Sequence, residues 1–272
     1  MIKACLGLLL AVISTGALAT GSRAAGGNLR VGGSDAVTEV LRQLAPQLKT
    51  ATGVALDVVP SLGSTGANAA VADGVLGLSV SGRDLTATET TRGLRVTAIF
   101  RTPFGLATSR IEPQMLRREE VALLYRADKP LWPDGTPILI VLRPVHETED
   151  AFLGSLFPGM VEALARLLKR TDLSLAAADQ ANADMGEKTR GSLIGITLAQ
   201  VIAEKRDLRF VAIDGVGPSL ANLENGSYPY GRDLYVVMSS AVSPDAETFI
   251  TFVLRPAGQS LLRKAGIVAG DK

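Results

Sequence analysis

Two short turns in this sequence carry residue types that suit the binding of a negatively charged group. Ser34 and Asp35 follow the strand-like run NLRVGG, and Gly63, Ser64 and Thr65 follow a second such run, VALDVVPS. A helix is expected to begin at each turn, where the first N–H groups of the helix have no partner within it. These N–H groups, the nearby hydroxyls and the positive end of the helix dipole together favour an anion. Because serine, threonine and aspartate also cap helices that bind nothing, one such turn alone indicates little.

Both turns lie in a chain that alternates strand-like and helix-like segments. Residues 35–50 repeat apolar side chains at helical spacing, and the runs LGLSVSGRDL, TAIFRTPFGLATS and ILIVLR are typical of strands. A final helix is expected from Pro244. The alternation predicts an α/β fold with a doubly wound sheet, in which ligands bind at the carboxyl ends of the strands. Two hydroxyl-bearing helix starts at neighbouring strand ends therefore shift the balance toward a binding site.

The first 19 residues have the layout of a secretory signal peptide. Lys3 provides a positive start, an apolar run follows, and Ala17-Leu18-Ala19 forms a cleavage site with small residues at its outer positions. The apolar run is shorter than the roughly 20 residues that a membrane-spanning helix needs. Cleavage is expected after Ala19 and also removes Cys5, the only cysteine of the chain. We therefore expect a soluble exported protein without disulfide bonds.

The composition predicts a globular protein with a small-molecule or protein partner. The chain has 272 residues, of which 47% are hydrophobic and 20% charged, enough for one large domain or two lobes. It holds 28 basic and 27 acidic residues, and loss of Lys3 with the signal makes these numbers equal. A chain without net charge has no electrostatic field that would attract nucleic acid or anionic lipid, and it holds only 7 Phe, 4 Tyr and 1 Trp.

Taken in order, several segments resemble the periplasmic phosphate-binding proteins of ABC importers, of which this chain looks like a divergent member. The similar segments are VGGSDAVTEVLRQLAPQL, SLGSTGANAAVADGVLGLSVSGRDL, ILIVLR, VAIDGVGPSLANLENGSYPYGRDLYVVM and FITFVLRPAGQSLLRKAGIV. The resemblance implies an α/β, two-lobed type II periplasmic-binding-protein fold, with each lobe a doubly wound mixed sheet covered by helices on both faces. The expected first lobe comprises residues 28–105 and 232–272, and the second comprises residues 106–231.

The same resemblance implies how the protein works. A small oxyanion would be clamped between the lobes of a periplasmic monomer, and an ABC permease in the inner membrane would recognise the closed form. Whether the protein serves uptake or sensing is left open by the sequence.

Ligand-binding roles for particular residues also follow from the resemblance. Ser34 with the amides after it resembles the first set of oxyanion donors, and Gly63, Ser64 and Thr65 resemble the second. Arg143, at the end of ILIVLR, resembles an arginine that forks onto two ligand oxygens.

Arg83 is the most ambiguous of the candidate residues. It lies where many relatives of the family carry an arginine, so the resemblance includes it among the ligand-binding residues. An ion pair with Asp84 or another surface carboxylate explains this arginine equally well.

Two departures from the family pattern bear on the identity of the anion. After Arg143 the family has a Gly-Ser-Gly-Thr helix start, whereas this chain reads RPVHETEDAF and keeps only Thr148 as a hydroxyl donor. Three carboxylates stand at this helix start: Glu147, Glu149 and Asp150. Gly82 takes the place of an aspartate that in some relatives accepts a hydrogen bond from protonated phosphate, a role that Asp35 could fill.

The acidic helix start weakens the case for a doubly charged ligand. Like charges 4 Å apart repel by about 4 kcal/mol at an effective dielectric of 20, whereas acidic side chains that point to water merely favour the helix dipole. Phosphate is the leading ligand by resemblance. The alternatives are another oxyanion, a phosphonate or a carboxylate metabolite.

Other classes of function find less support in these residues. His146 is the only histidine, and its spacing from the nearby acids matches no common ligand pattern, so no metal or cofactor is expected. Ser64 lies in Gly-Ser-Thr-Gly rather than in the Gly-x-Ser-x-Gly turn of hydrolases, and nothing connects His146 to it as a base. The protein is therefore not expected to be an enzyme. An exported interaction protein that binds no small anion is the alternative to a solute-binding protein.

Overall fold

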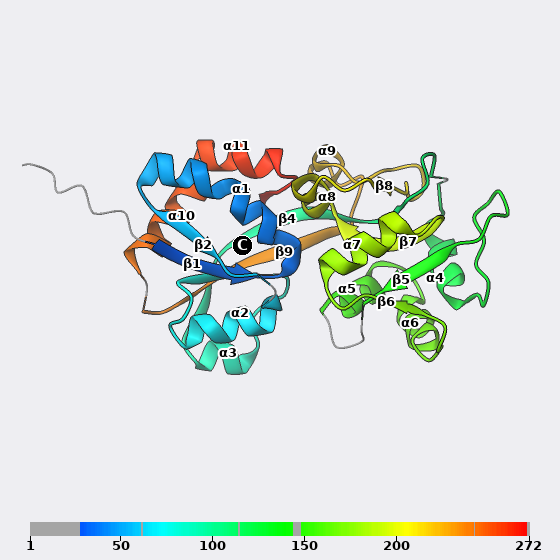
Figure 1. The fold of residues 1–272 in the computed structure, drawn as a ribbon, viewed down its shortest axis with the longest axis horizontal. Coiled ribbons are helices and arrows are strands. Elements are labelled where there is room, and N and C mark those ends of the chain that lie inside the picture. Colours follow the sequence, from blue (N-terminus) through cyan, green and yellow to red (C-terminus); the bar gives the residue numbers. More distant parts are fainter. Residues whose placement is uncertain (1–27, 61, 114, 144–147, 242, 271–272) are drawn as a thin grey trace, which may run out of the picture.

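The computed structural model of the protein describes residues 28–60, 62–113, 115–143, 148–241 and 243–270, with the backbone alone for residues 148–151. The predicted signal peptide lies outside these ranges. Within them a 10-stranded sheet follows the order β2-β1-β3-β9-β4-β7-β5-β6, and β8 and β10 pair with β4. Figure 1 shows two groups of elements side by side, with β4 and β9 running between them.

The described strands are β1 (Asn28–Gly33), β2 (Ala55–Val58), β3 (Leu78–Ser81), β4 (Leu94–Thr108), β5 (Leu139–Leu142), β6 (Ser174–Leu175), β7 (Ser192–Thr197), β8 (Arg209–Phe210), β9 (Gly231–Ser239) and β10 (Val268–Ala269). The described helices are α1 (Asp35–Thr52), α2 (Gly63–Ala72), α3 (Ala87–Thr91), α4 (Arg118–Arg126), α5 (Thr148–Leu156), α6 (Met160–Leu167), α7 (Asp179–Lys188), α8 (Leu198–Glu204), α9 (Leu220–Glu224), α10 (Pro244–Leu254) and α11 (Pro256–Lys264).

The sheet is mixed, and one long strand carries it from the first lobe into the second. β1 is parallel to β2 and β3, and β5 is parallel to β6 and β7, while β3, β9, β4 and β7 alternate in direction. The first part of β4 pairs with β9 from Leu94 to Pro103, and its last part pairs with β7 from Phe104 to Ala107. This two-lobed mixed α/β architecture confirms the predicted fold class.

Hydrophobic cores lie on both faces of the sheet in each lobe. In the first lobe, α1 and α10 pack on one face with Val80 and Leu234, while Ala67 and Val71 of α2 pack on the other. In the second lobe, α4 and α6 contribute to one core and α7 contributes to another. Helices thus cover both faces of each half of the sheet, which is the doubly wound arrangement.

One helix is shared between the lobes. α8 falls within residues 106–231, yet Ala199 and Ala203 pack into the core that α1 forms in the first lobe. Gln43 Nε2 of α1 also donates a hydrogen bond of 2.7 Å to the carbonyl of Ala203. The lobe boundaries expected from the sequence stay a prediction, with α8 in contact with both sides.

The final helix expected from Pro244 is two helices. α10 ends before Arg255, whose extended backbone (φ −77°, ψ 159°) turns the chain before α11 begins at Pro256. Proline lacks a backbone N–H and disfavours helical geometry in the residue before it, which explains the break. No helix within the described ranges is long and apolar enough to cross a membrane.

The turn from β1 into α1 depends on a close approach of two strands. A Cβ atom at Gly33 would lie 2.1 Å from the carbonyl oxygen of Val80 on β3, so no side chain fits at this position. The next residue, Ser34, donates its backbone N–H to the same oxygen at 2.9 Å. Gly33 therefore allows β1 to end against β3 and sets the point at which α1 begins.

The substitution Gly33→Ala is expected to lower the free energy of unfolding by about 2 kcal/mol or more, because the added methyl overlaps the Val80 carbonyl. Urea unfolding of the mature protein measures this change. Gly217→Ala is the control, since nothing lies within 4 Å of a Cβ at that position, and it is expected to change the stability by less than about 0.5 kcal/mol. Equal stability of both variants would contradict the close approach.

Candidate functional site

The first candidate helix start lies at the junction of the lobes. Ser34 occupies the position before α1 and is 8% exposed, but its side chain makes no capping hydrogen bond with the helix. Among the residues that the structure describes, none hydrogen-bonds to the Ser34 hydroxyl. Asp35 is also buried, and its backbone carbonyl accepts a hydrogen bond of 3.0 Å from Gln180 Nε2 of α7. The start of α1 therefore lies against the second lobe with a hydroxyl that does not cap the helix.

The second candidate helix start is held against the end of β3. Gly63 begins α2 with a φ of +61°, a conformation that glycine adopts without strain. The buried Ser64 Oγ accepts a hydrogen bond of 2.9 Å from the backbone N–H of Gly82. Since a hydroxyl that accepts one bond still has its own hydrogen to donate, Ser64 keeps a donor for a ligand. The exposed Thr65 accepts a bond of 3.2 Å from Arg83 Nη2 through its Oγ1.

Arg83 forms a two-pronged ion pair within the first lobe. Its Nη1 and Nη2 each lie 2.8 Å from an oxygen of Glu89, and the two side chains are 21% and 12% exposed. The hydrogen bonds from Arg83 lower the pKa of Glu89 to about 2, against the opposing effect of burial. The ion-pair interpretation of Arg83 thus fits the geometry, with Glu89 in place of Asp84, and the arginine supports the α2 turn through Thr65.

Arg143 lies at the carboxyl end of β5 and is held by a buried acid. Its Nη1 donates a hydrogen bond to Asp179, the first residue of α7, and the two side chains are 11% and 6% exposed. The neighbouring Gln180 is the residue that reaches the carbonyl of Asp35. Two adjacent residues of α7 thus contact Arg143 of the second lobe and Asp35 of the first. The start of α7 therefore links the arginine to the start of α1 across the contact between the lobes.

The candidates that follow Arg143 in the sequence lie partly or wholly outside the described residues. Thr148 is the first residue of α5, so a helix lies where the family resemblance implied one. The Thr148 side chain lies outside the described atoms, as do those of Glu149 and Asp150. Residues 144–147, which include His146 and Glu147, lie outside the described ranges altogether.

One buried cation was missed by the sequence reasoning. Arg232, near the start of β9, is 6% exposed. A Cβ atom at Gly82 would lie only 2.9 Å from its Nη2, which places the guanidinium beside the end of β3. The sequence signal was present, because Arg232 stands two residues before Leu234 in a strand that alternates buried and partly exposed side chains. An arginine on the buried face of such a strand calls for a compensating partner.

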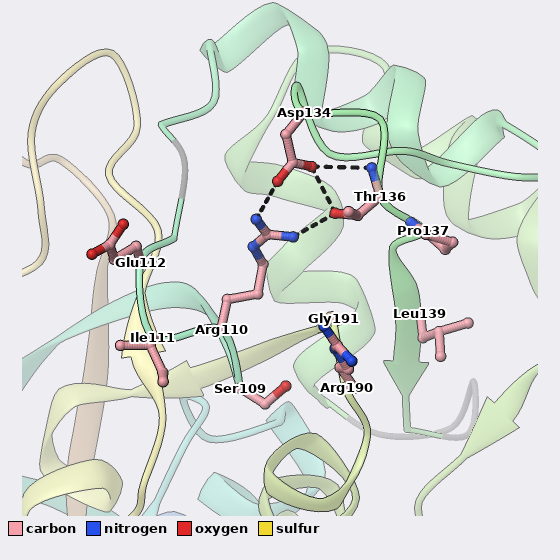
Figure 2. A pocket seen from close by; sticks show the side chains of 10 residues that line it. All are labelled: Ser109, Arg110, Ile111, Glu112, Asp134, Thr136, Pro137, Leu139, Arg190 and Gly191. Atoms are coloured by element: carbon pink, nitrogen blue, oxygen red, sulfur yellow. Dashed lines mark hydrogen bonds and ion pairs between the residues drawn. The ribbon is translucent and has the colours of Figure 1, made fainter.

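A large cavity in the described part of the chain lies away from these residues. It has a volume of about 1070 Å³ and is lined mainly by the loops after β4 and before β5 and β7. Figure 2 shows Asp134 between Arg110 and Thr136, both hydrogen-bonded to it, with Arg190 and Leu139 across the cavity. Two of these loops precede the parallel strands β5 and β7, whereas Arg143 follows β5. The cavity is therefore at the opposite edge of the second lobe from the predicted site.

A second groove borders the predicted site directly. It has a volume of about 780 Å³ and lies where α1 faces α7 and α8, with Asp35, Gln180 and Arg206 in its lining. Arg206 is already paired with Asp184, Glu187 and Glu204. In the described part of the chain, no group of three or more His, Cys, Asp or Glu residues is arranged to hold a metal ion.

Comparisons with known proteins identify the fold. A model described as the PBP superfamily domain matches residues 18–257. No curated protein sequence matches the chain. A putative phosphate ABC transporter substrate-binding protein from Clostridium perfringens, solved with bound phosphate, shares 20% identity at a TM-score of 0.76, covering 90% of this chain and 100% of that one.

Two further solved structures extend the comparison. An ABC-type phosphate transport receptor from Vibrio cholerae shares 15% identity at a TM-score of 0.60, covering 88% of this chain and 99% of that one. The periplasmic molybdate-binding protein of Azotobacter vinelandii shares 15% identity at a TM-score of 0.61, covering 89% and 100%. At these identities the likeness concerns the fold.

The substitution Glu89→Gln is expected to reduce stability at neutral pH by about 1.5–3 kcal/mol, since Arg83 loses its charged acceptor. The lowered pKa of Glu89 means that the ionised carboxylate stabilises the fold above its ordinary pKa of 4.5, and that this stability is lost as the pH falls toward about 2. The wild type should therefore lose more stability than the variant between about pH 5 and pH 2. Urea unfolding across that range tests this.

Glu119→Gln serves as the matched control, because Glu119 is exposed and only loosely paired with Arg117. Its acid sensitivity should equal that of the wild type. The same result for Glu89→Gln would show that the Arg83–Glu89 pair contributes no pH-dependent stability.

Proposed function

The chain belongs to the PBP superfamily, and from that premise we propose that it is an exported solute-binding protein rather than an enzyme. Residues 28–105 with 232–272 form one lobe, residues 106–231 form the other, and a small oxyanion is clamped between them. The three solved structures described above are those of binding or transport proteins, which supports this class of function.

The observation that carries the proposal is that two helix starts with serine hydroxyls meet at the end of β3. Ser34 bonds to Val80 through its backbone, and Ser64 bonds to Gly82 through its side chain. Val80 and Gly82 are two residues apart, so α1 and α2 begin close to one another. Their partial positive charges then add at this position, with hydroxyls beside them to donate to the oxygens of an anion.

The second lobe contributes a fixed positive charge. The Arg143 side chain is 11% exposed and is oriented by Asp179. The contact between Gln180, the residue after Asp179, and Asp35 brings this part of the second lobe to the start of α1. A guanidinium suits two oxygens of one ligand because its N–H groups form a planar fork. Thr148, at the start of α5, supplies a further hydroxyl from the same lobe. Ligand binding closes the lobes to the extent that the closed form binds more tightly.

The proposed ligand is phosphate, held by Ser34, Gly63, Ser64 and Thr65 from one lobe and by Arg143 and Thr148 from the other. The solved structures with this fold include a protein with bound phosphate and one described as molybdate-binding, and both ligands are tetrahedral oxyanions. The acidic residues at the start of α5 oppose a multiply charged ligand. A phosphonate or a carboxylate metabolite is therefore the second candidate.

The partner and the location follow from the same proposal. The signal peptide is removed near Ala19 and the mature protein works in the periplasm as a monomer. An ABC permease in the inner membrane recognises the closed, ligand-bound form. An exported interaction protein with the same fold but no small ligand is the alternative, favoured by the loss of the glycine-rich turn after Arg143.

Ligand binding is tested on the purified mature protein by thermal shift with phosphate, sulfate, molybdate, methylphosphonate and small carboxylates. A ligand at 100 times its Kd should stabilise the protein by about 2.7 kcal/mol. Stabilisation by one of these anions is expected. No effect from any of them would favour the interaction protein.

The substitution Arg143→Ala is expected to weaken the binding of that anion more than tenfold, because the fork from the second lobe is lost. Isothermal titration calorimetry measures the affinity. Since the variant leaves Asp179 buried without its cation, its melting temperature is recorded and Arg143→Lys, which keeps the charge, is measured beside it. Arg30→Ala, which removes an exposed arginine on β1 paired with Asp57, is the control. Wild-type affinity in both Arg143 variants would show that the site lies elsewhere.

A further inference from the structure

A buried arginine stands where the two lobes join. Arg232 belongs to β9 and pairs through its backbone with Thr102 of β4, next to the point where β4 leaves β9 for β7. The residue is 6% exposed, less than either serine of the proposed site. It belongs to β9, a strand that runs between the lobes (Figure 1), and to neither of the two helices that begin at the proposed site.

The guanidinium of Arg232 lies on the same side of the sheet as α1. Side chains two residues apart on a strand share a face, so Arg232 shares a face with Leu234 and Val236. Both of these pack in the core that α1 forms with β3 and β9. Because β9 runs antiparallel to β3, Arg232 lies beyond Leu234 in the direction of Gly82, the end at which α1 and α2 begin. The distance of 2.9 Å from its Nη2 to a Cβ built on Gly82 agrees with this placement.

The charge of Arg232 has little compensation in the described part of the chain. No described carboxylate pairs with it, and no described side chain accepts a hydrogen bond from it. Its one described partner is the ring of Phe152 on α5, 5.0 Å from the guanidinium carbon. Removing an arginine from water costs more than one contact with an aromatic ring returns. A buried cation in this state is suited to an anion that arrives from outside.

We propose that Arg232 is a second guanidinium ligand of the anion, and that the site therefore selects doubly charged tetrahedral oxyanions over monocarboxylates. This inference rests on the proposed function, because it concerns the same binding site. Arg143 approaches from the second lobe, and Arg232 approaches from the strand that joins the lobes. Arg143 is already paired with Asp179, so Arg232 adds the uncompensated positive charge that a ligand with two negative charges needs and that one paired cation with neutral donors does not supply.

The contact with Phe152 gives the second arginine a further role. Phe152 lies one turn after Thr148, so the ring reaches Arg232 from the first part of α5. An anion bound to Arg232 is thereby placed next to the helix start that has lost the glycine-rich turn. The arginine thus offers hydrogen-bond donors to the anion in a chain whose sequence lacks the donors of the glycine-rich turn.

The test compares Arg232→Gln with the wild type by isothermal titration calorimetry, with inorganic phosphate, sulfate and acetate as probes. Affinity for phosphate and sulfate is expected to fall more than tenfold, while the already weaker binding of acetate changes less than threefold. Arg101→Gln is the matched control, because Arg101 is the cross-strand neighbour of Asp233 on the same pair of strands and is half exposed. The control should bind all three probes as the wild type does.

Thermal melting without ligand separates this inference from a purely structural role. Removal of an uncompensated buried cation should leave the melting temperature of Arg232→Gln at or above that of the wild type. A lower melting temperature with unchanged affinity would show that Arg232 pairs with the acidic start of α5 instead, and would overturn the inference. If the Gln variant does not fold, Arg232→Lys replaces it. Its affinity for phosphate is expected to fall at least threefold, and wild-type affinity in this variant would overturn the inference.

The two proposals fail in different ways. A wild type that binds none of the three probes, nor any other anion in the thermal-shift screen, refutes the proposed function. A wild type whose binding depends on Arg143 but is unchanged in Arg232→Gln refutes only the role of Arg232. Equal loss of acetate and phosphate affinity in Arg232→Gln contradicts the selection by ligand charge.

Discussion

The contact between the end of β1 and the end of β3 is the constraint on which the candidate site depends. Gly33 leaves no room for a side chain against Val80, and Ser34 then bonds to the same carbonyl. A strand that ends one residue earlier or later would turn α1 away from this edge and reverse the faces of the side chains that follow. The position of the first helix start, its distance from the second and its contact with α7 all follow from this close approach of two parallel strands.

Much of the first lobe could be predicted from local sequence patterns. β1, α1 and α2 follow from alternating or helically spaced apolar residues, with glycine, serine and proline at their ends. These signals lie within a few residues of one another, so they can be recognised in the sequence without knowledge of the tertiary structure. The start of α5 near Thr148 was expected from the family resemblance instead, which implies a helix start after Arg143. The fold class then followed from the order of the segments, and the family match agrees with it.

The charged partners could not be predicted in this way. Arg83 bonds to Glu89 six residues away, but Arg143 bonds to Asp179, which is 36 residues later. Arg232 meets Gly82 and Phe152 from two other parts of the chain. Such contacts depend on how strands are ordered in the sheet, and an isolated arginine carries no sign of which acid it will reach. Three arginines of similar appearance in the sequence therefore have three different surroundings in the structure.

The pairing of β4 with β9 has a consequence for how the protein is made. β9 comes near the end of the chain, yet it inserts between β3 and β4, so the first lobe lacks an interior strand until the last part has been synthesised. Contacts of such long sequence separation form slowly, because loop closure must precede them. The first lobe thus cannot complete its sheet until β9 has emerged from the ribosome. Slow assembly of this kind agrees with the proposed export, in which the polypeptide is threaded through a secretion channel before it acquires its native shape.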